Sequence, residues 1–133
     1  MDDEQRYDAG MAVRRQVLGD AWVNKAQAGL NPFNSEFQNL ITRYAWGEIW
    51  TRPRLERKTR SCMVLSTLIA LGAWDEFSLH VRAAINNGLD NDDIKEVILQ
   101  AAIYCGVPKA NHAIKVAQAV LAAMTAQDAQ REV

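Results

Sequence analysis

The sequence predicts an all-α fold of six to seven helices. Apolar residues recur at intervals of three and four along most of the chain, and no segment alternates apolar and polar residues as a half-buried strand would. Glycines, prolines and capping residues separate these segments. We therefore expect one helical domain over residues 1–133, in which the polar tail from about residue 127 frays.

Two helices are expected at the start of the chain. The first covers residues 2–18, has Tyr7 on its apolar side and stops at Gly19. The second covers residues 21–28, and Asp20 is the expected cap.

A third helix is expected to begin at Asn34 or Ser35 and to extend to about Tyr44. The segment that follows, residues 46–53, has two tryptophans, a glycine, an acid and an arginine before Pro53. Proline disfavours the helical conformation in the residue before it. The periodicity of this segment assigns it to no element.

Residues 59–88 predict two helices that turn back on each other at Gly72, the first of them beginning near residue 55. The first is too apolar for a surface helix, so we expect it inside the fold. On the second, His80 lies about 60° from the centre of an apolar stripe. We therefore expect its imidazole at the edge of the core. The stripe consists of Trp74, Phe77, Val81, Ala84 and Ile85.

Two more helices are expected in the last part of the chain. Asp90 and Asp93 resemble a capping box before a helix that ends at Gly106, and Pro108 suits the first position of the last helix. The apolar stripe of the first of these is Ile94, Val97, Ile98, Ala101 and Cys105. That of the second is Ala113, Ala117, Val120, Leu121 and Met124.

Composition excludes some classes of function. A net charge of -1 and a pI near 6.1 argue against a protein that mainly binds nucleic acid or an anionic membrane. The N-terminus lacks a signal-peptide pattern, and the longest apolar run, of about ten residues, is too short to span a bilayer. We therefore expect a cytoplasmic protein without membrane association. Cys62 and Cys105 are expected as buried free thiols, and no metal site is expected, because their spacing fits none.

Apolar helix faces and four tryptophans exceed what one small helical domain can bury. We therefore expect a homo-oligomer.

Three segments carry a family resemblance. They are FQNLITRYAWGEIWTRP (residues 37–53), LHVRAAINNG (79–88) and YCGVPKAN (104–111), and together they resemble the carboxymuconolactone decarboxylase family of the alkylhydroperoxidase D-like superfamily. The similarity extends from about Tyr7 to Ala123. It implies a ring-shaped homohexamer, a trimer of dimers. It also implies a cofactor-free carboxy-lyase that converts 4-carboxymuconolactone to 3-oxoadipate enol-lactone and CO2 in protocatechuate (β-ketoadipate pathway) catabolism.

The resemblance excludes thiol chemistry. Reductases of the superfamily have a glutamate, a Cys-x-x-Cys pair and a histidine, and the first three positions correspond here to Ser61, Ala73 and Glu76. Only His80 is shared, so thiolate attack is not available at this position.

The implied substrate is a lactone dicarboxylate, which loses CO2 and leaves its electrons on the lactone carbonyl oxygen. Such a reaction needs a donor at this oxygen and a proton for the ring. We expect His80 to polarise the carbonyl or to deliver the proton, because the unperturbed pKa of histidine is near 6.5. Glu48 is a second candidate acid if its position between two tryptophans desolvates it.

Three arginines are candidates for holding a substrate carboxylate with paired hydrogen bonds: Arg43, Arg52 and Arg82. An ion pair between Glu48 and Arg43 or Arg52 is an alternative. The remaining candidates are Trp46, Trp50, Tyr104 and Asn111. The two tryptophans either form a dry pocket wall or pack in the core or an interface. The other two either donate to the lactone or only cap and pack.

Two other functions stay open at this point. A related cofactor-free enzyme acting on another lactone or on a hydroperoxide would share the same fold. A helical assembly module would use the apolar faces for a partner and would have no catalytic activity.

Overall fold

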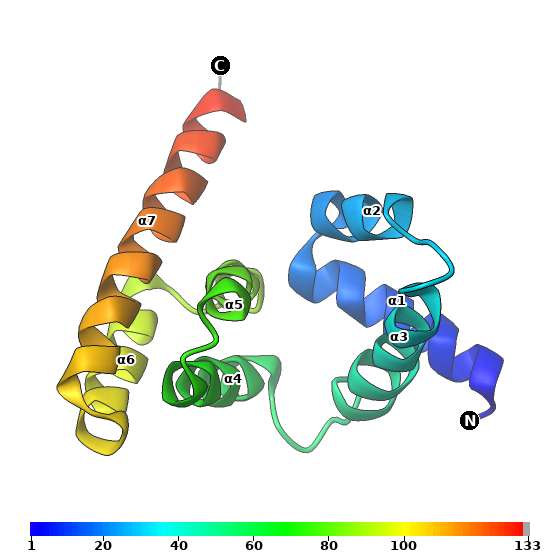
Figure 1. Cartoon of the computed structure of the whole chain (residues 1–133), viewed down its shortest axis with the longest axis horizontal. Coiled ribbons are helices and arrows are strands. Elements are labelled where there is room, and N and C mark those ends of the chain that lie inside the picture. Colours follow the sequence, from blue (N-terminus) through cyan, green and yellow to red (C-terminus); the bar gives the residue numbers. More distant parts are fainter. Residues whose placement is uncertain (132–133) are drawn as a thin grey trace. The chain divides into compact units, whose positions relative to one another are not determined.

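The computed structural model describes residues 1–131, and every regular element in that range is a helix (Figure 1). The expected all-α fold is confirmed. The chain divides into two compact units, residues 1–57 and the part from Lys58 onward. The single domain expected over the whole chain stays a prediction.

The first unit contains α1 (Asp3–Leu18), α2 (Asp20–Ala28), α3 (Ser35–Leu40) and η1 (Ile41–Ile49). A capping box between Asp2 and Gln5 starts α1, and Gly19 ends it as expected. The expectation for Asp20 is wrong at one point. Gly19 takes the cap position of α2, and Asp20 is its first residue and pairs with Arg15 at 3.1 Å.

Half of the segment that periodicity left unassigned, residues 46–49, is the end of a π-helix, η1, which begins at Ile41 within the expected third helix. η1 continues α3, and at its end the amide of Trp50 bonds to the carbonyl of Ala45, five residues earlier, at 3.0 Å. π-Helical segments are rare and are frequent at functional sites. This wider turn carries three of the predicted site residues, Arg43, Trp46 and Glu48.

α1 and η1 cross closely at two glycines. A Cβ atom on Gly10 would collide with the carbonyl oxygen of Thr42, and one on Gly47 would collide with the carbonyl oxygen of Arg6. Only glycine leaves room for this approach. The crossing therefore fixes η1 against α1.

The second unit contains α4 (Arg57–Leu71), α5 (Trp74–Asn86), α6 (Asn91–Cys105) and α7 (Val107–Arg131). Gly72 makes the turn from α4 to α5 with a φ of 67°, and the capping box of Asp90 and Asp93 starts α6. The four helices share one core, composed of Leu65, Ile69, Phe77, Val81, Ala84, Leu89, Ile94, Ile98, Ala101, Ala110, Ala113 and Ala117. The turn at Gly72 and the stripe and capping box of α6 are confirmed. The expectation that α4 lies inside the fold is wrong: only Ser61, Leu65 and Ile69, one stripe of the helix, are buried, and its other apolar side chains reach the surface.

The last helix differs from the prediction at both ends. Val107, not Pro108, is its first residue, and the helix extends to Arg131 instead of fraying after Ala126. Residues 132–133 of the expected tail lie outside the described residues. Cys62 and Cys105 are free, as expected, but each is half-buried.

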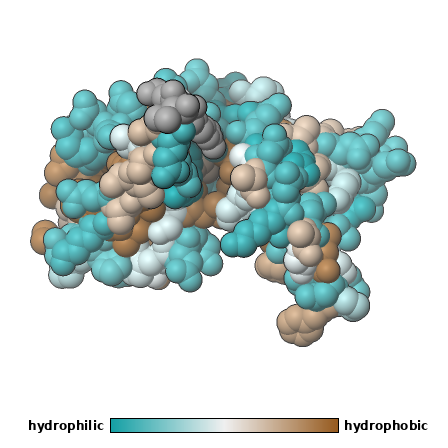
Figure 2. All heavy atoms as spheres, turned by 90° about the horizontal axis from the view of Figure 1, so that it is seen from above, coloured by the Kyte–Doolittle hydropathy of each residue, from teal (hydrophilic) through white to brown (hydrophobic). Residues whose placement is uncertain are grey.

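Large apolar side chains are exposed in both units, and brown apolar atoms stand among the teal polar ones in Figure 2. In the first unit they include Phe33, Phe37, Leu40 and Tyr44. In the second they include Met63, Leu71, Leu99, Ile103, Tyr104 and Val107. Among residues 1–131, no helix is both long and apolar enough to cross a membrane.

Candidate functional site

The predicted site residues divide between the two units. One group lies on or just after η1: Arg43, Trp46, Glu48, Trp50 and Arg52. The other group lies on the last three helices: His80, Arg82, Tyr104 and Asn111.

His80 is half-buried on α5. Its Nδ1 atom is buried and has no hydrogen-bond partner among the described residues. Burial lowers the pKa of the imidazole, and the nearby Glu76 carboxylate opposes this with a smaller rise. The ring is therefore mainly neutral at pH 7. A neutral imidazole has one nitrogen that donates and one that accepts, and Nδ1 is one of the two that has no protein partner.

Arg82 lies two residues after His80, which places it about 200° round α5 and thus on the other side of the helix. Its Nη1 donates to Oε1 of Gln127 on α7 at 3.2 Å. Arg82 therefore joins α5 to α7, and it does not share a helix face with His80.

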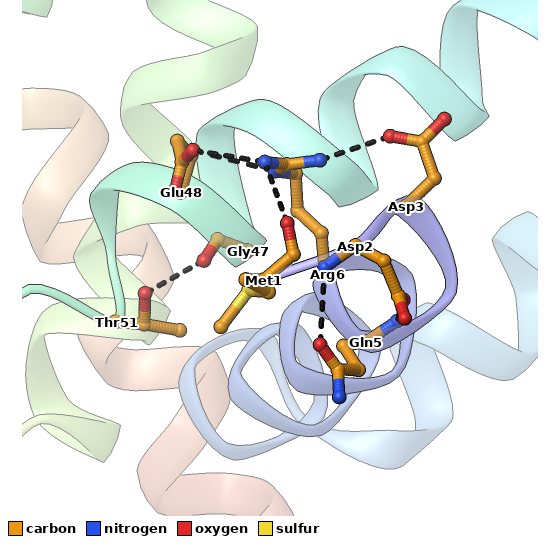
Figure 3. Close-up of polar contacts among 8 residues, drawn as sticks. All are labelled: Met1, Asp2, Asp3, Gln5, Arg6, Gly47, Glu48 and Thr51. Atoms are coloured by element: carbon orange, nitrogen blue, oxygen red, sulfur yellow. Dashed lines mark hydrogen bonds and ion pairs between the residues drawn. The ribbon is translucent and has the colours of Figure 1, made fainter.

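Glu48 is tied to α1 through Arg6 (Figure 3). The Nε and Nη2 atoms of Arg6 each lie 3.3 Å from Oε1 of Glu48, while Nη1 lies 2.9 Å from Oδ1 of Asp3. The Glu48 side chain is 47% exposed, so its expected desolvation is wrong. The π-helical segment presents this carboxylate to α1 and to solvent instead. An exposed, paired carboxylate is suited to holding α1 against η1.

Arg43 lies against the ring of Tyr7 on α1, with its guanidinium carbon 5.1 Å from the ring centroid. Its Nε atom is buried and has no hydrogen-bond partner within residues 1–131. Contact with the aromatic face holds a guanidinium in place without using its N–H donors. Arg43 thus retains donors for a carboxylate.

Trp46 and Trp50 stack on each other in the first unit, with ring centroids 5.1 Å apart and planes at 32°. Trp46 is buried and Trp50 is half-buried. The pair is an apolar surface beside Glu48. Trp46 packs in the core of this unit, which is one of the two roles expected for the tryptophans.

The other candidates have exposed side chains. Arg52 precedes Pro53, Tyr104 is 80% exposed near the end of α6, and Asn111 lies in the second turn of α7. His112 is also exposed, and its ring lies 4.4 Å from that of Trp74. The roles of Arg52, Tyr104 and Asn111 stay predictions.

The second unit also has an open groove of about 750 Å³ between α4 and α6. None of the predicted site residues lines it. Burial raises the pKa of its Cys62 thiol, and the Asp93 carboxylate adds to the rise, so this thiol is a poor nucleophile. Its walls are Lys58, Thr59, Cys62, Met63, Ser66, Thr67, Leu89, Asp93, Glu96, Val97 and Gln100.

Sequence reasoning missed the contribution of α1. Arg6 and Tyr7 hold Glu48 and Arg43, and Arg14 is buried at 2% exposure against η1. Arg14 lies seven residues after Tyr7, so it falls within the apolar stripe predicted for this helix. A cation inside an apolar stripe was the available signal.

Comparison with known proteins identifies the family. Residues 35–119, which extend over parts of both units, match the sequence model of the carboxymuconolactone decarboxylase family. The chain belongs to this family. Residue His80 and the segment from Arg43 to Arg52 lie within the matched range, whereas Arg6, Tyr7 and Arg14 lie before it.

Relatives within the family have decarboxylase names. The chain is 49% identical over 120 residues to a 4-carboxymuconolactone decarboxylase of Acinetobacter baylyi, covering 90% of each chain. It is 46% identical over 112 residues to the nitrosuccinic acid decarboxylase of Metarhizium robertsii, covering 84% of this chain and 78% of that protein. A 4-carboxymuconolactone decarboxylase sequence of Pseudomonas putida matches at 62% identity over 48 residues, 36% of this chain and 100% of that sequence.

Metal binding depends on how the usual ligands are grouped in the described part of the chain. No group of three or more His, Cys, Asp or Glu side chains within residues 1–131 is placed to hold a metal ion.

Proposed function

We propose that this protein is a carboxy-lyase that converts 4-carboxymuconolactone to 3-oxoadipate enol-lactone and CO2, in the protocatechuate branch of aromatic catabolism. One observation carries the proposal. The chain and the Acinetobacter baylyi 4-carboxymuconolactone decarboxylase are 49% identical over 90% of both lengths. The thiol chemistry of the superfamily's reductases is not available at this position, because Ser61, Ala73 and Glu76 stand where those enzymes have a glutamate and two cysteines.

The substrate itself supplies the electron sink for this reaction. When the ring carboxylate leaves as CO2, the bonding pair spreads through the ring alkene to the lactone carbonyl oxygen. One proton then adds to the ring carbon beside the carbonyl, which balances the reaction. The protein therefore needs a donor at the carbonyl oxygen and a cation for the carboxylate that stays.

His80 is the proposed donor at the carbonyl oxygen. An imidazole here could polarise the carbonyl or deliver the proton. The lowered pKa of His80 favours polarisation, because a neutral ring has an N–H to donate but no excess proton. Its buried, unpartnered Nδ1 is consistent with a group that meets its partner only in the substrate complex.

Arg43 is the proposed anchor for the acetate carboxylate. It has donors to spare, whereas Arg82 already bonds to Gln127. Holding the carboxylate that does not react leaves the departing one free, so the binding energy does not oppose the reaction. A guanidinium also grips a carboxylate with two parallel hydrogen bonds.

A second candidate substrate is nitrosuccinate, because the Metarhizium robertsii relative is a nitrosuccinic acid decarboxylase. Loss of a carboxylate beside a nitro group leaves charge on the nitro oxygens, and a second carboxylate stays. Both reactions thus need one oxyanion donor and one carboxylate anchor. The two substrates differ in the ring, which an apolar aromatic surface such as the half-buried Trp50 would favour.

A direct assay separates these substrates. Purified protein is mixed with 4-carboxymuconolactone or with nitrosuccinate, and CO2 release and the ultraviolet absorbance of the lactone are followed. We expect CO2 from the lactone at a kcat/KM at least about tenfold above that for nitrosuccinate, which corresponds to roughly 1.4 kcal/mol in the barrier. The reverse order would assign the nitro acid, and no turnover of either would favour a related enzyme acting on another lactone or on a hydroperoxide, or else the assembly module.

We also propose that the enzyme is a homo-oligomer, as a homohexamer built from dimers. The exposed apolar side chains of both units support this, because a monomer rarely leaves so many uncovered. A cytoplasmic location is part of the same proposal, since a dianionic lactone does not cross a lipid bilayer unaided.

A further inference from the structure

A buried positive charge in the first unit has no acid to balance it. Arg14 on α1 is 2% exposed, and no described residue forms an ion pair with it. Burial lowers the pKa of its guanidinium. Because an uncompensated charge is costly in a protein interior, its surroundings must supply acceptors.

Neutral groups supply only part of what Arg14 needs. Nη1 donates to the Thr42 hydroxyl at 3.2 Å, and Nη2 donates to Oε1 of Gln38 at 2.9 Å. The guanidinium carbon lies 5.5 Å from the ring centroid of Trp22 on α2. Nε is buried without a partner within residues 1–131. The described hydrogen bonds and ring contact of Arg14 are therefore all to neutral groups.

A hollow of about 340 Å³ lies beside this arginine, within the range of small-molecule sites, about 300–1,000 Å³. Two of its walls, Trp22 and Gln38, are the groups that contact Arg14. The full lining is Trp22, Lys25, Ala26, Gly29, Asn34 and Gln38.

The side-chain polar groups of this hollow that have no described partner are donors. Arginine can only donate, so its bond to Oε1 fixes the Gln38 amide with its NH2 group free. The amide of Asn34 is used within its own turn, where Oδ1 accepts from Asn31 and Nδ2 donates to Gly29. Lys25 is exposed in the last turn of α2, where a cation also offsets the negative helix end, and it has no described ion-pair partner. No acid lines the hollow.

We propose that this hollow, which neither His80 nor Arg43 lines, is a second binding site for a small planar carboxylate. The carboxylate bonds to Lys25 and to the NH2 group of Gln38, and the flat part of the ligand lies on Trp22. Arg14 acts from behind through Gln38 and the ring. This site does not depend on the proposed decarboxylation.

Nuclear magnetic resonance tests the site with benzoate as the probe. ¹⁵N-labelled protein is titrated with sodium benzoate at constant ionic strength, and the Trp22 indole and Gln38 side-chain amide signals are followed. We expect saturable shifts of both signals. Inorganic phosphate should shift them at least several-fold more weakly, because it has no flat apolar part.

Variants separate this site from the catalytic one. Lys25→Gln should weaken benzoate binding about threefold, the size expected for one exposed ion pair. Lys115→Gln on α7 is the matched control and should leave it unchanged, as should Arg43→Gln. Arg14→Met should abolish the shifts. If Arg14→Met does not fold, Lys25→Gln still tests the proposal.

Three results would overturn the proposal. They are linear, non-saturating shifts at Trp22 and Gln38, equal affinity for phosphate, and benzoate shifts that vanish in Arg43→Gln but persist in Lys25→Gln. The last would assign benzoate to the decarboxylase site.

Discussion

His80 is the residue on which the proposed chemistry depends. It is a half-buried, mainly neutral imidazole whose Nδ1 has no described partner. A donor aimed at charge that develops only in the transition state raises kcat and has little effect on KM. This separates it from a histidine that is merely packed.

Replacing His80 with Asn should lower kcat by about 10²- to 10³-fold, the usual effect of losing one oxyanion donor. KM should change by less than about threefold, because the ground-state carbonyl gains little from the bond. Steady-state kinetics with 4-carboxymuconolactone measure both. A variant with wild-type kcat would remove His80 from the mechanism. His112→Asn, at an exposed ring on Trp74, is the control.

The same imidazole predicts how stability depends on pH. Burial lowers the pKa of His80 in the folded state below 6.5, so below that pH the unfolded chain binds more protons. Stability should therefore fall as the pH falls from about 6.5 through the folded pKa, which is the window set by this shift. Urea unfolding at pH 7.5 and pH 5 should show a smaller loss for His80→Gln than for the wild type. Equal losses would contradict the assignment.

Tyr7 is a positioning residue for Arg43. Removing its ring as Tyr7→Leu should raise KM about two- to fivefold, since an exposed cation–π contact contributes about 0.5–1 kcal/mol. The kcat should change little. Tyr7→Phe keeps the ring and should restore the wild-type KM. A phenylalanine variant as weak as the leucine variant would indicate that the hydroxyl acts instead.

At the level of elements, the contact between α1 and η1 organises the first unit. Gly10 and Gly47 allow the two backbones to touch. Arg6, near the start of α1, pairs with Glu48, near the end of η1 (Figure 3). Since η1 carries Arg43, Trp46 and Glu48, any shift of α1 would move them together.

Gly10→Ala should destabilise the protein by about 1–3 kcal/mol, because a methyl group there overlaps the Thr42 carbonyl and backbone cannot move aside cheaply. Gly29→Ala is the matched control. A Cβ atom at Gly29 would lie 3.6 Å from its nearest neighbours, an ordinary contact, and its φ is -88°. Chemical unfolding should therefore separate the two variants. Equal stability would mean that the crossing relaxes.

For the whole molecule, the main feature is the set of large apolar side chains that folding of a single chain leaves exposed to water. Phe33, Phe37 and Leu40 are 98%, 61% and 54% exposed. Phe33 lies in the turn before α3, and Phe37 and Leu40 lie three residues apart on α3. Burying apolar surface gains about 25 cal/mol per Å², so their burial between copies would favour assembly.

Phe37→Glu should reduce the size of the assembly, because a carboxylate is costly in an apolar interface. Analytical ultracentrifugation measures the mass of the assembly in solution. Glu36→Lys, which changes charge at the adjacent exposed position, should leave it largely unchanged. A monomeric wild-type protein would refute the homo-oligomer, and an unaltered assembly in Phe37→Glu would place the interface elsewhere.

Local patterns were enough to predict the α-helices and many of their ends, but not η1, the cap of α2 or the bounds of α7. Side chains that repeat every three or four residues, glycines with positive φ and the Asp90–Asp93 capping box act over a few residues, so their consequences are visible in the sequence. The position of His80 at a core edge follows from the same periodicity. Family membership also followed from short segments, of which the tryptophan-rich one is the most distinctive.

Contacts between distant residues were decided only by the tertiary structure. Glu48 pairs with Arg6, and Arg43 lies on Tyr7; both contacts join positions more than thirty residues apart. The π-helical turn of η1 depends on how α1 packs against it. Local periodicity has no term for such contacts, because they form when two backbones approach at Gly10 and Gly47. The same packing buries Arg14, whose charge then needs partners that no neighbouring residue in the sequence supplies.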